Sequence, residues 1–373
     1  VVLPAGNYNM NSLTKYRAKG RFPVLSWVGP KNQCLVRSSQ ALPGTFGQVK
    51  CEDDISILES FMKMSGYNYL FVYDARPKLN TKATRIQGGG MESSSAYPFC
   101  SFVNLAMDSI KDVKNSFMKL LKTVVFDTRE SYEFKLSIEN SKWLQSIDAL
   151  IGYAKDIATK LYSGCSILIH CRNGWDTTCQ LVSLVLIMVD PYYRTIEGFL
   201  VLIQREWVAM GHRFTLRTGC GVKWDIDILP LISSYYPAPI KKYNSSIIRA
   251  NIDNSSDTAT SPIFFQFIEA VHHIKKAHPN EFQFKDNLLV FIADSLYSGR
   301  FSTFYEGTIK DFNYSNTPSM FDYIMENVLT FNNQEFIGNS VTLFPVIDMS
   351  QSTLWDEYFF REEKNAIRIH QTS

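Results

Sequence analysis

The sequence predicts an α/β fold in which helices flank a central, mostly parallel sheet. Short apolar runs rich in β-branched residues alternate along the chain with longer amphipathic stretches, a pattern typical of parallel sheets. The clearest unit is the apolar run 166–169, bounded by Gly164 and followed by a stretch at 178–189 that is long enough for a helix. A chain of 373 residues that is 45% hydrophobic can bury the large core that this fold requires.

The first half of the chain is predicted to supply three further strands and four helices. The strands are indicated by short apolar runs, and the helices by apolar residues three or four positions apart. In the segment 53–64 acidic residues come first, where they suit the positive end of a helix. The expected strands are 21–27, 69–73 and 102–107, and the expected helices are a short one within 3–19, then 53–64, 110–124 and 143–162.

The second half is predicted to be mainly helical. The run 181–189 is apolar on nearly every side and must be buried, and Pro191 ends it. Further helices are expected at 263–274 and 287–296. The stretch 219–260 has too few periodic positions for a domain of its own. We therefore predict a single domain over residues 1–373 that carries a long surface insertion at about 219–260.

Composition excludes several classes of function. A formal net charge of +2 gives no overall field for a polyanion, so we expect no nucleic-acid partner. The longest apolar run is far shorter than the roughly 20 residues that a membrane-spanning helix needs. Seven cysteines, an odd number without paired metal spacing, indicate reduced thiols and a cytoplasmic protein rather than a disulfide framework.

Two conspicuous features are expected to be structural. Arg76 follows the strand 69–73, and we expect it to form an ion pair rather than to bind a ligand. The adjacent His272 and His273 have no cysteine or acid at ligand spacing, so we expect both on the surface of a helix. The sequence thus predicts no metal and no cofactor.

The stretch 170–178, His-Cys-Arg-Asn-Gly-Trp-Asp-Thr-Thr, carries the candidate chemistry. A tight turn from strand to helix would direct the amides of 172–177 at one point at the positive end of the helix, where an anion binds well. Such surroundings favour a thiolate, although Cys171 alone is more simply a small buried hydrophobe. Cysteine-dependent phosphatases have an arginine six positions after the cysteine, and this chain has Thr177 there.

This stretch resembles the loop of active myotubularin lipid phosphatases, which reads His-Cys-Ser-Asp-Gly-Trp-Asp-Arg-Thr. The residues in common are His170, Cys171, Gly174, Trp175, Asp176 and Thr178. Further strings that resemble the family lie at 21–27, 74–77, 88–92, 206–214, 297–304, 321–328 and 354–360. The resemblance implies the cysteine-dependent phosphatase fold, enlarged as in myotubularins. The N-terminal membrane-binding domain and C-terminal coiled coil of the family are not expected within this chain.

The resemblance also implies roles for particular residues. Cys171 matches the nucleophile, and Asp176 matches the general acid for the leaving inositol oxygen. In myotubularins the arginines that match Arg213 and Arg217 reach the lipid's phosphates. A spacing of four residues would direct both side chains to one side. The alternative is that each arginine forms a surface salt bridge. The full predicted substrate site is Arg172, Asn173, Gly174, Trp175, Thr177, Arg213 and Arg217.

Three departures from the family pattern fall on the chemistry, and one of them is the pair Ser109 and Ser137, which stand where active relatives often have asparagines that line the lipid pocket. Thr177 replaces the arginine that holds the phosphoryl oxygens, and Asn173 replaces an acid. By analogy with an arginine finger, the loss of the arginine costs of order 10³–10⁵ in rate. We therefore predict a catalytically inactive member, a pseudophosphatase. It would bind a phosphoinositide or a similar phosphate anion and would regulate or recruit an active myotubularin in a hetero-oligomer.

The alternative is an active or weakly active phosphoinositide 3-phosphatase. It would act on phosphatidylinositol 3-phosphate and 3,5-bisphosphate through a phosphocysteine intermediate on Cys171, with Arg172 as a substitute cation. Under either hypothesis the family resemblance implies a cytoplasmic protein with peripheral contact to endosomal membranes.

Overall fold

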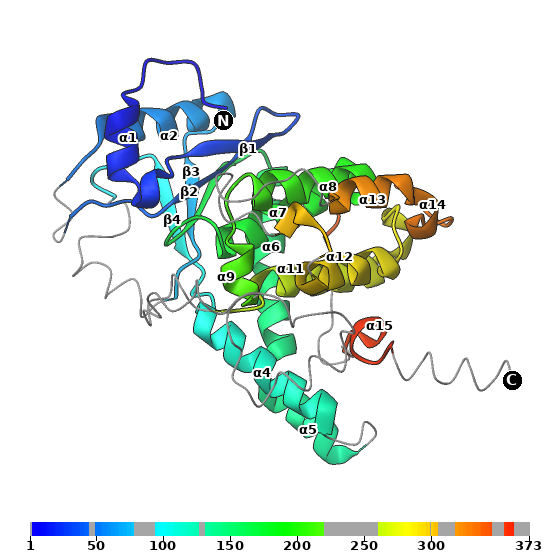
Figure 1. The fold of residues 1–373 in the computed structure, drawn as a ribbon. Helices are drawn as coiled ribbons and strands as arrows, with labels where there is room; N and C mark the ends of the chain where they lie inside the picture. Colours follow the sequence, from blue (N-terminus) through cyan, green and yellow to red (C-terminus); the bar gives the residue numbers. More distant parts are fainter. Residues whose placement is uncertain are drawn as a thin grey trace, which may run out of the picture.

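A five-stranded sheet in the order β1-β2-β5-β3-β4 forms the centre of the molecule (Figure 1). The structure, a computed structural model, describes residues 2–44, 49–77, 94–126, 131–219, 260–298, 300–304, 318–344 and 354–361. β1 (Val24–Val28) is antiparallel to β2 (Cys34–Ser39). The remaining neighbours run parallel: β2 pairs with β5 (Ser166–Cys171), β5 with β3 (Leu70–Asp74), and β3 with β4 (Cys100–Asn104). The predicted α/β class with a mostly parallel central sheet is confirmed.

β5 occupies the middle of the sheet because it can be covered on both faces. All six of its residues are buried, which is typical of a strand between parallel neighbours with helices on either side. The register places Cys171 beside Ser39 of β2 and His170 beside Asp74 of β3. The carboxyl ends of three parallel strands therefore meet at one edge, which is where open α/β sheets bind their ligands.

Helices α1 (Met10–Tyr16) and α2 (Glu52–Met64) pack together on one face of the sheet. Three acids open α2, where they suit its positive end, and its apolar residues, including Phe61, join a small core with Val36 and Leu168. A buried ion pair between Arg17 and Asp54 at 2.6 Å ties the end of α1 to α2.

The opposite face carries a larger helical layer around α6 (Trp143–Tyr162) and α7 (Thr177–Val189) (Figure 1). α7 is buried from Thr178 to Val189 because the sheet, α6 and α11 surround it. The other longer helices are α4 (Ile110–Phe126), α5 (Tyr132–Ser141), α8 (Ile196–Ile203), α11 (Ile263–Ala277) and α12 (Asp286–Ser298). Shorter ones are α9 (Phe214–Thr218), α13 (Met320–Glu326), α14 (Val328–Phe331) and α15 (Asp356–Phe359).

Single turns of other helix types connect these elements. The 3₁₀ turns are η1 (Ala18–Gly20), η2 (Pro191–Arg194), η5 (Pro279–Glu281) and η6 (Ser302–Phe304). A π-helical turn, η3 (Gln204–Val208), continues directly from α8. Such π turns are often found at functional sites.

The expected elements are present with small shifts at their ends, but several others were not predicted. These include the strand β2 and the helices α5, α8, α9 and α14. Arg76 forms the expected structural ion pair, with Asp74 at 2.7 Å. The string at 88–92 and nearly all of the proposed insertion, residues 220–259, lie outside the described residues, so the insertion and the single domain stay predictions.

The expectation for the two adjacent histidines was wrong. His272 and His273 are both buried, because α11 is covered by other helices on the side where they lie. His272 Nδ1 lies 2.7 Å from Asp286 Oδ1, and its ring stacks on Trp355 at 5.0 Å between centroids. Within the described ranges no group of three or more potential ligand side chains could hold a metal ion.

Two further properties concern membrane spans and thiols. None of the helices in the described part of the chain is long and apolar enough to cross a membrane. The cysteines described by the structure, Cys34, Cys51, Cys100, Cys165, Cys171 and Cys179, are all free thiols.

Candidate functional site

The loop between β5 and α7 closes around the thiol of Cys171. The backbone N–H of Gly174 donates to Sγ at 3.3 Å, and the cysteine is 7% exposed. Gly174 has a φ of +74°, and a Cβ there would lie 2.7 Å from the carbonyl oxygen of Ser38. Only glycine can therefore bring the loop this close to the end of β2. The strand, loop and helix arrangement expected from the sequence is present.

A buried arginine on β2 supports the loop from behind. Arg37 Nη2 donates to the carbonyl oxygen of Gly174 at 2.6 Å, and Nη1 donates to Glu206 Oε2 at 2.7 Å. Glu206 belongs to the π-helical turn η3, and both side chains are almost fully buried. Arg37 therefore holds the peptide that joins Gly174 to Trp175, next to the peptide whose N–H points at Cys171.

A second thiol lies against this arginine. Cys179 Sγ in the first turn of α7 accepts a hydrogen bond from Arg37 Nη2 at 3.0 Å. Burial raises the pKa of Cys179 to about 11, and Arg37 offsets only part of that effect. Cys179 therefore remains a protonated thiol near neutral pH, and it packs the base of the loop.

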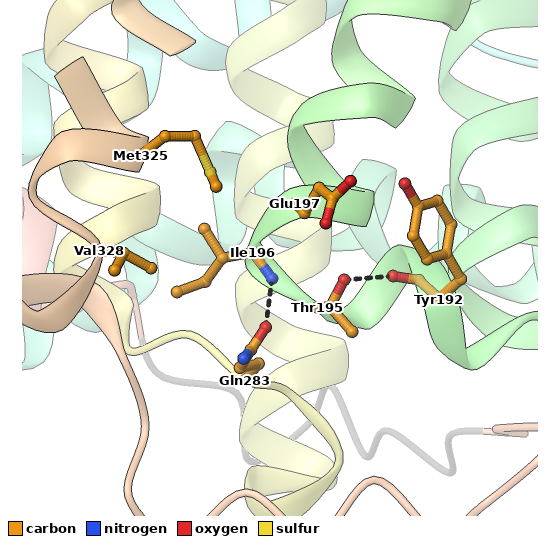
Figure 2. Close-up of a pocket in the computed structure, with 7 residues that line it drawn as sticks. All are labelled: Tyr192, Thr195, Ile196, Glu197, Gln283, Met325 and Val328. Carbon is orange, nitrogen blue, oxygen red and sulfur yellow. Dashed lines mark hydrogen bonds between the residues drawn. The ribbon is translucent and has the colours of Figure 1, made fainter. Parts of the chain in front are cut away.

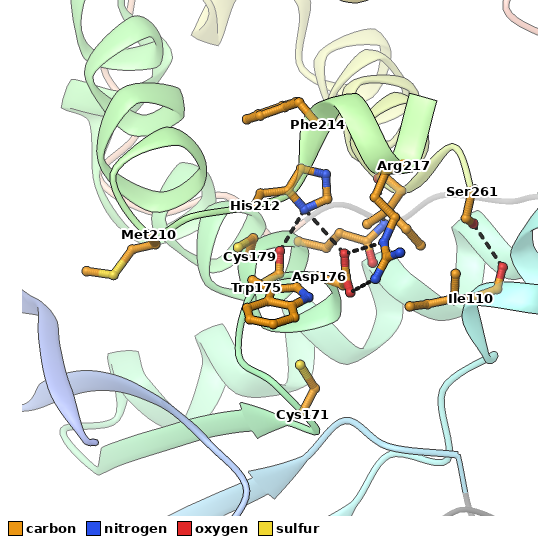
Figure 3. A network of polar contacts seen from close by, with 12 residues as sticks. Ile110, Cys171, Trp175, Asp176, Cys179, Met210, His212, Phe214, Arg217 and Ser261 are labelled. Atoms are coloured by element: carbon orange, nitrogen blue, oxygen red, sulfur yellow. Dashed lines mark hydrogen bonds and ion pairs between the residues drawn. The ribbon is translucent and has the colours of Figure 1, made fainter. Parts of the chain in front are cut away.

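Asp176 forms an ion pair with Arg217 (Figure 3). Arg217 Nε and Nη2 donate to the two carboxylate oxygens at 2.9 and 2.7 Å, and His212 Nδ1 lies 3.3 Å from Oδ1. Burial raises the pKa of the Asp176 carboxyl, but Arg217 and His212 outweigh burial, so the pKa lies well below its usual range. Asp176 is therefore a carboxylate at neutral pH.

His212 joins the loop to the aromatic core. Its Nδ1 lies 2.7 Å from the carbonyl oxygen of Trp175, which can only accept, so Nδ1 carries the proton. The ring also makes edge contacts with Trp207 and Phe214, at 4.9 and 4.7 Å between centroids. Sequence reasoning assigned His212 no function. Its only signal was its place next to Arg213 in a string that resembles the family.

Arg213 and Arg217 both reach the loop, but they contact different groups. Arg217 is buried against Asp176, whereas Arg213 is exposed and lies over the ring of Trp175 at 4.4 Å. A third arginine, Arg21, lies over the same ring at 5.7 Å, and sequence reasoning did not include it in the site. Several cations thus surround the loop, as anion binding requires.

Comparison with known families identifies the family of this domain. A family model described as myotubularin-like phosphatase domain matches residues 3–311, which is most of the chain. The chain belongs to the myotubularin-like phosphatase domain family. The family resemblance seen in the sequence is therefore confirmed.

Several curated relatives resemble this myotubularin-family chain over nearly its whole length. Myotubularin of Xenopus laevis is 35% identical over 365 residues, which are 96% of this chain and 55% of the relative. The phosphatidylinositol-3,5-bisphosphate 3-phosphatase MTMR2 of Mus musculus is 34% identical over 372 residues, 97% of this chain and 53% of the relative. The chain thus spans a little over half the length of the curated relatives it matches.

The remaining predicted site residues of this myotubularin-family loop lie in different environments. Thr177 is the first residue of α7 and is half-buried, and Asn173 is buried within the loop. Arg172 is exposed, and its carbonyl oxygen accepts the backbone N–H of Gln40 at 3.3 Å. The loop therefore places Cys171, Asn173, Trp175 and Asp176 inward, while the Arg172 side chain lies at the surface.

A separate surface hollow of about 400 Å³ lies between η2, the start of α8 and the α13–α14 region (Figure 2). Two of its polar groups already have partners: Gln283 Oε1 accepts the N–H of Ile196 at 2.9 Å, and Thr195 Oγ1 donates to the carbonyl oxygen of Tyr192 at 2.8 Å. None of the residues that line it belongs to the loop after β5, so it is not part of the candidate site.

Proposed function

We propose that this chain is a pseudophosphatase, a myotubularin-family domain whose loop binds a phosphate-bearing anion without hydrolysing it. The observation that carries the proposal is the residue at position 177. Thr177 begins α7, at the position where the family's arginine would hold the phosphoryl oxygens. Its hydroxyl can donate one neutral hydrogen bond but supplies no charge, and phosphoryl transfer depends mainly on positioning and charge stabilisation.

The ionisation of Asp176 also supports the proposal. A general acid must carry a proton before it can give one to the leaving oxygen. Arg217 and His212 hold the pKa of this carboxyl well below its usual range in spite of burial, which acts in the opposite direction. In the arrangement described here, Asp176 serves as the acceptor in an ion pair and not as a proton donor.

The loop nevertheless keeps features that suit anion binding. The N–H of Gly174 points at Cys171 Sγ, and the positive end of α7 follows the loop. We infer a phosphoinositide headgroup as the natural anion, because the mouse relative is named as a phosphatidylinositol-3,5-bisphosphate 3-phosphatase. The inferred role is to regulate or recruit an active myotubularin in a hetero-oligomer, in the cytoplasm and at the surface of endosomal membranes.

An active phosphoinositide 3-phosphatase is the second candidate, and the retained Cys171 favours it. Its sulfur would attack phosphorus, forming a sulfur–phosphorus bond while the bond to the inositol oxygen breaks, and water would later release phosphate. This reaction would need another cation in place of the arginine absent at position 177. Arg172 would have to leave its exposed position to supply that charge.

The deciding experiment measures phosphate release from vesicles that contain phosphatidylinositol 3-phosphate or phosphatidylinositol 3,5-bisphosphate. The wild-type chain should release no more phosphate than Cys171→Ser, while mouse MTMR2 serves as the positive control. Turnover that disappears in Cys171→Ser would refute the proposal. Loss of that turnover in Arg172→Ala would then identify Arg172 as the substitute cation.

A further inference from the structure

Two arginines from distant parts of the chain lie over the ring of Trp175. Arg213 comes directly before α9, and Arg21 lies between η1 and β1, with guanidinium carbons 4.4 and 5.7 Å from the ring centroid. Trp175 is 5% exposed, and its indole N–H has no acceptor among the described residues. A buried donor without a partner and two cations thus meet at one side of the loop.

The main chain holds Arg21 close to the end of β5. Its carbonyl oxygen accepts the backbone N–H of Ser39 at 3.0 Å, and Ser39 is the register partner of Cys171. Its guanidinium donates to the carbonyl oxygen of Met210, in the segment that leads to Arg213. Arg21 is therefore fixed one strand away from the loop.

The charges around this side of the loop are not balanced. Arg217 is already paired with Asp176, whereas neither Arg21 nor Arg213 forms an ion pair with a carboxylate within the part of the chain that the structure describes. Burial, followed by repulsion from Arg37, lowers the pKa of the half-buried Arg21. A desolvated cation of this kind is stabilised when an anion binds beside it.

We propose that Arg21 is a further anion-binding residue, which acts with Arg213 and the indole N–H of Trp175 to hold a phosphate monoester at the loop. This inference rests on the proposed function, because it requires that the loop binds phosphate. The two arginines supply charge from the side of Trp175, whereas the family's arginine would supply it from the start of α7. Such a placement suits binding without restoring the clamp that is absent at Thr177.

The test compares two sources of the same phosphate chemistry. Calorimetry measures binding of inorganic phosphate, and flotation measures binding of vesicles that contain phosphatidylinositol 3-phosphate. Arg21→Met keeps the aliphatic part of the side chain and removes the charge. We expect it to weaken binding in both assays by about ten- to a hundredfold, the usual effect of losing one hydrogen bond to a charged group.

Arg361→Met is the matched control. Arg361 also lies over an aromatic ring, that of Tyr358 at 5.3 Å, but it follows α15 and pairs with Asp294 of α12. We expect this variant to bind phosphate and vesicles as the wild type does. A loss equal to that of Arg21→Met would show that any stacked arginine matters, which would overturn the inference.

The outcomes separate this inference from the proposed function. If Arg21→Met binds phosphate as well as the wild type, Arg21 is not an anion ligand, and the pseudophosphatase proposal stands. A loss confined to vesicles also overturns the inference, since Arg21 would then contact the membrane. A wild-type chain that binds neither probe removes both proposals. If Arg21→Met does not fold, Arg21→Lys replaces it; a folded Arg21→Lys should keep most of the binding, and complete loss would contradict a role for the charge.

Discussion

In the proposed function, Thr177 at the start of α7 stands where the family's arginine would face the equatorial oxygens of a transferring phosphoryl group. Loss of a comparable arginine costs of order 10³–10⁵ in rate in other phosphoryl-transfer enzymes, or roughly 4–7 kcal/mol of barrier. One neutral hydroxyl recovers little of this, since a neutral hydrogen bond contributes about 1 kcal/mol. The proposal is therefore that the loop keeps the cysteine of the family pattern but lacks the charge on which phosphoryl transfer depends.

Placing a positive charge at position 177 should give the loop some phosphatase activity. We expect Thr177→Arg alone to give little, because the new arginine would lie near Arg172, and like charges at close range repel. The triple variant combines Arg172→Ser, Asn173→Asp and Thr177→Arg. It should release phosphate from phosphatidylinositol 3-phosphate of order 10²-fold faster than the same variant with Cys171→Ser. This factor is a part of the rate enhancement that such an arginine supplies in other phosphoryl-transfer enzymes. A folded triple variant without activity would show that a defect outside these positions, such as the ionised Asp176, also blocks turnover.

The ion pair of Asp176 with Arg217 should be important for stability. Arg217→Met leaves the carboxylate of Asp176 buried without its main partner, which should lower the free energy of unfolding by about 3–5 kcal/mol. Urea denaturation at pH 7 measures the change. The double variant Asp176→Asn with Arg217→Met should be clearly more stable than Arg217→Met alone, because no unpaired charge then remains. Equal stability of the two variants would contradict this account.

Acid should remove the contribution of the same ion pair. The pKa of Asp176 lies below its usual value in the folded chain, so its contribution to stability is present above about pH 3.8 and is lost as the pH falls through the folded pKa. The variant Asp176→Asn should therefore lose less stability than the wild type between neutral pH and strongly acidic pH. A parallel decline in both proteins would show that other groups govern acid unfolding.

At the scale of elements, Arg37 connects β2, the loop and the π-helical turn η3. Arg37→Met should lower the free energy of unfolding by about 3 kcal/mol, since Glu206 loses its buried ion-pair partner and keeps Arg205 and a hydrogen bond from Ser26. It should also weaken phosphate binding, because the carbonyl of Gly174 is no longer held. Thermal unfolding and phosphate calorimetry measure the two effects.

Arg205→Met is the matched control for this prediction. Arg205 contacts the same carboxylate at 2.9 Å, but its side chain is 38% exposed and it makes no contact with the loop among the hydrogen bonds of the described residues. This variant should lose at most about 1 kcal/mol, as exposed pairs do, and should bind phosphate normally. If both variants lose phosphate binding equally, the effect comes from Glu206 and not from support of Gly174.

The elements that could be predicted from the sequence are those whose apolar pattern matches their burial. The helix α6 and the strand β5 have continuous apolar stripes or runs, and both were identified. β2 was missed because its sequence, Cys-Leu-Val-Arg-Ser-Ser, ends in polar residues that are nevertheless buried. Those residues are buried because they support the loop and join neighbouring segments, a role that periodicity does not reveal.

The same limit applies to the candidate site. The loop could be identified from one string of residues, since its chemistry is local in sequence. The contacts of His212 with Trp175 and of Arg217 with Asp176 join segments about 40 positions apart, and no local pattern encodes them. Thus the general-acid role of Asp176 was a prediction from the family resemblance, whereas the ionisation of its carboxyl depends on partners that only the fold brings together.

At the scale of the whole molecule, two of the buried titratable groups on α11, Glu269 and His273, lie close together. Glu269 Oε2 accepts the indole N–H of Trp143 at 2.9 Å, and its other oxygen lies 3.9 Å from His273 Nε2. Burial raises the pKa of Glu269 to about 8 although Trp143 opposes it, and burial together with His272 and Lys276 lowers the pKa of His273 to about 3. At neutral pH both groups are uncharged, so the 3.9 Å contact is not an ion pair.

Glu269 should lower the free energy of unfolding as the pH rises, and His273 should lower it as the pH falls. The folded pKa of Glu269 lies above its usual 4.5, so its contribution to stability is complete below pH 4.5 and is lost as the pH rises to about 8. The folded pKa of His273 lies below its usual 6.5, so its contribution is lost as the pH falls from 6.5 toward about 3. Between pH 6.5 and 8 the effect of Glu269 is therefore not cancelled by His273.

Glu269→Gln should remove this dependence on pH, because glutamine has the shape of the protonated acid and can still accept the N–H of Trp143. Between pH 6.5 and 8 the free energy of unfolding of the wild type should fall by about 2 kcal/mol more than that of Glu269→Gln, since each pH unit is worth about 1.4 kcal/mol for one proton. Urea denaturation at several pH values measures both slopes. Glu139→Gln, at an exposed position on α5, is the control and should keep the wild-type slope. Equal slopes for Glu269→Gln and the wild type would mean that Glu269 is already ionised in the folded core, and that a cation or water within the core stabilises its charge.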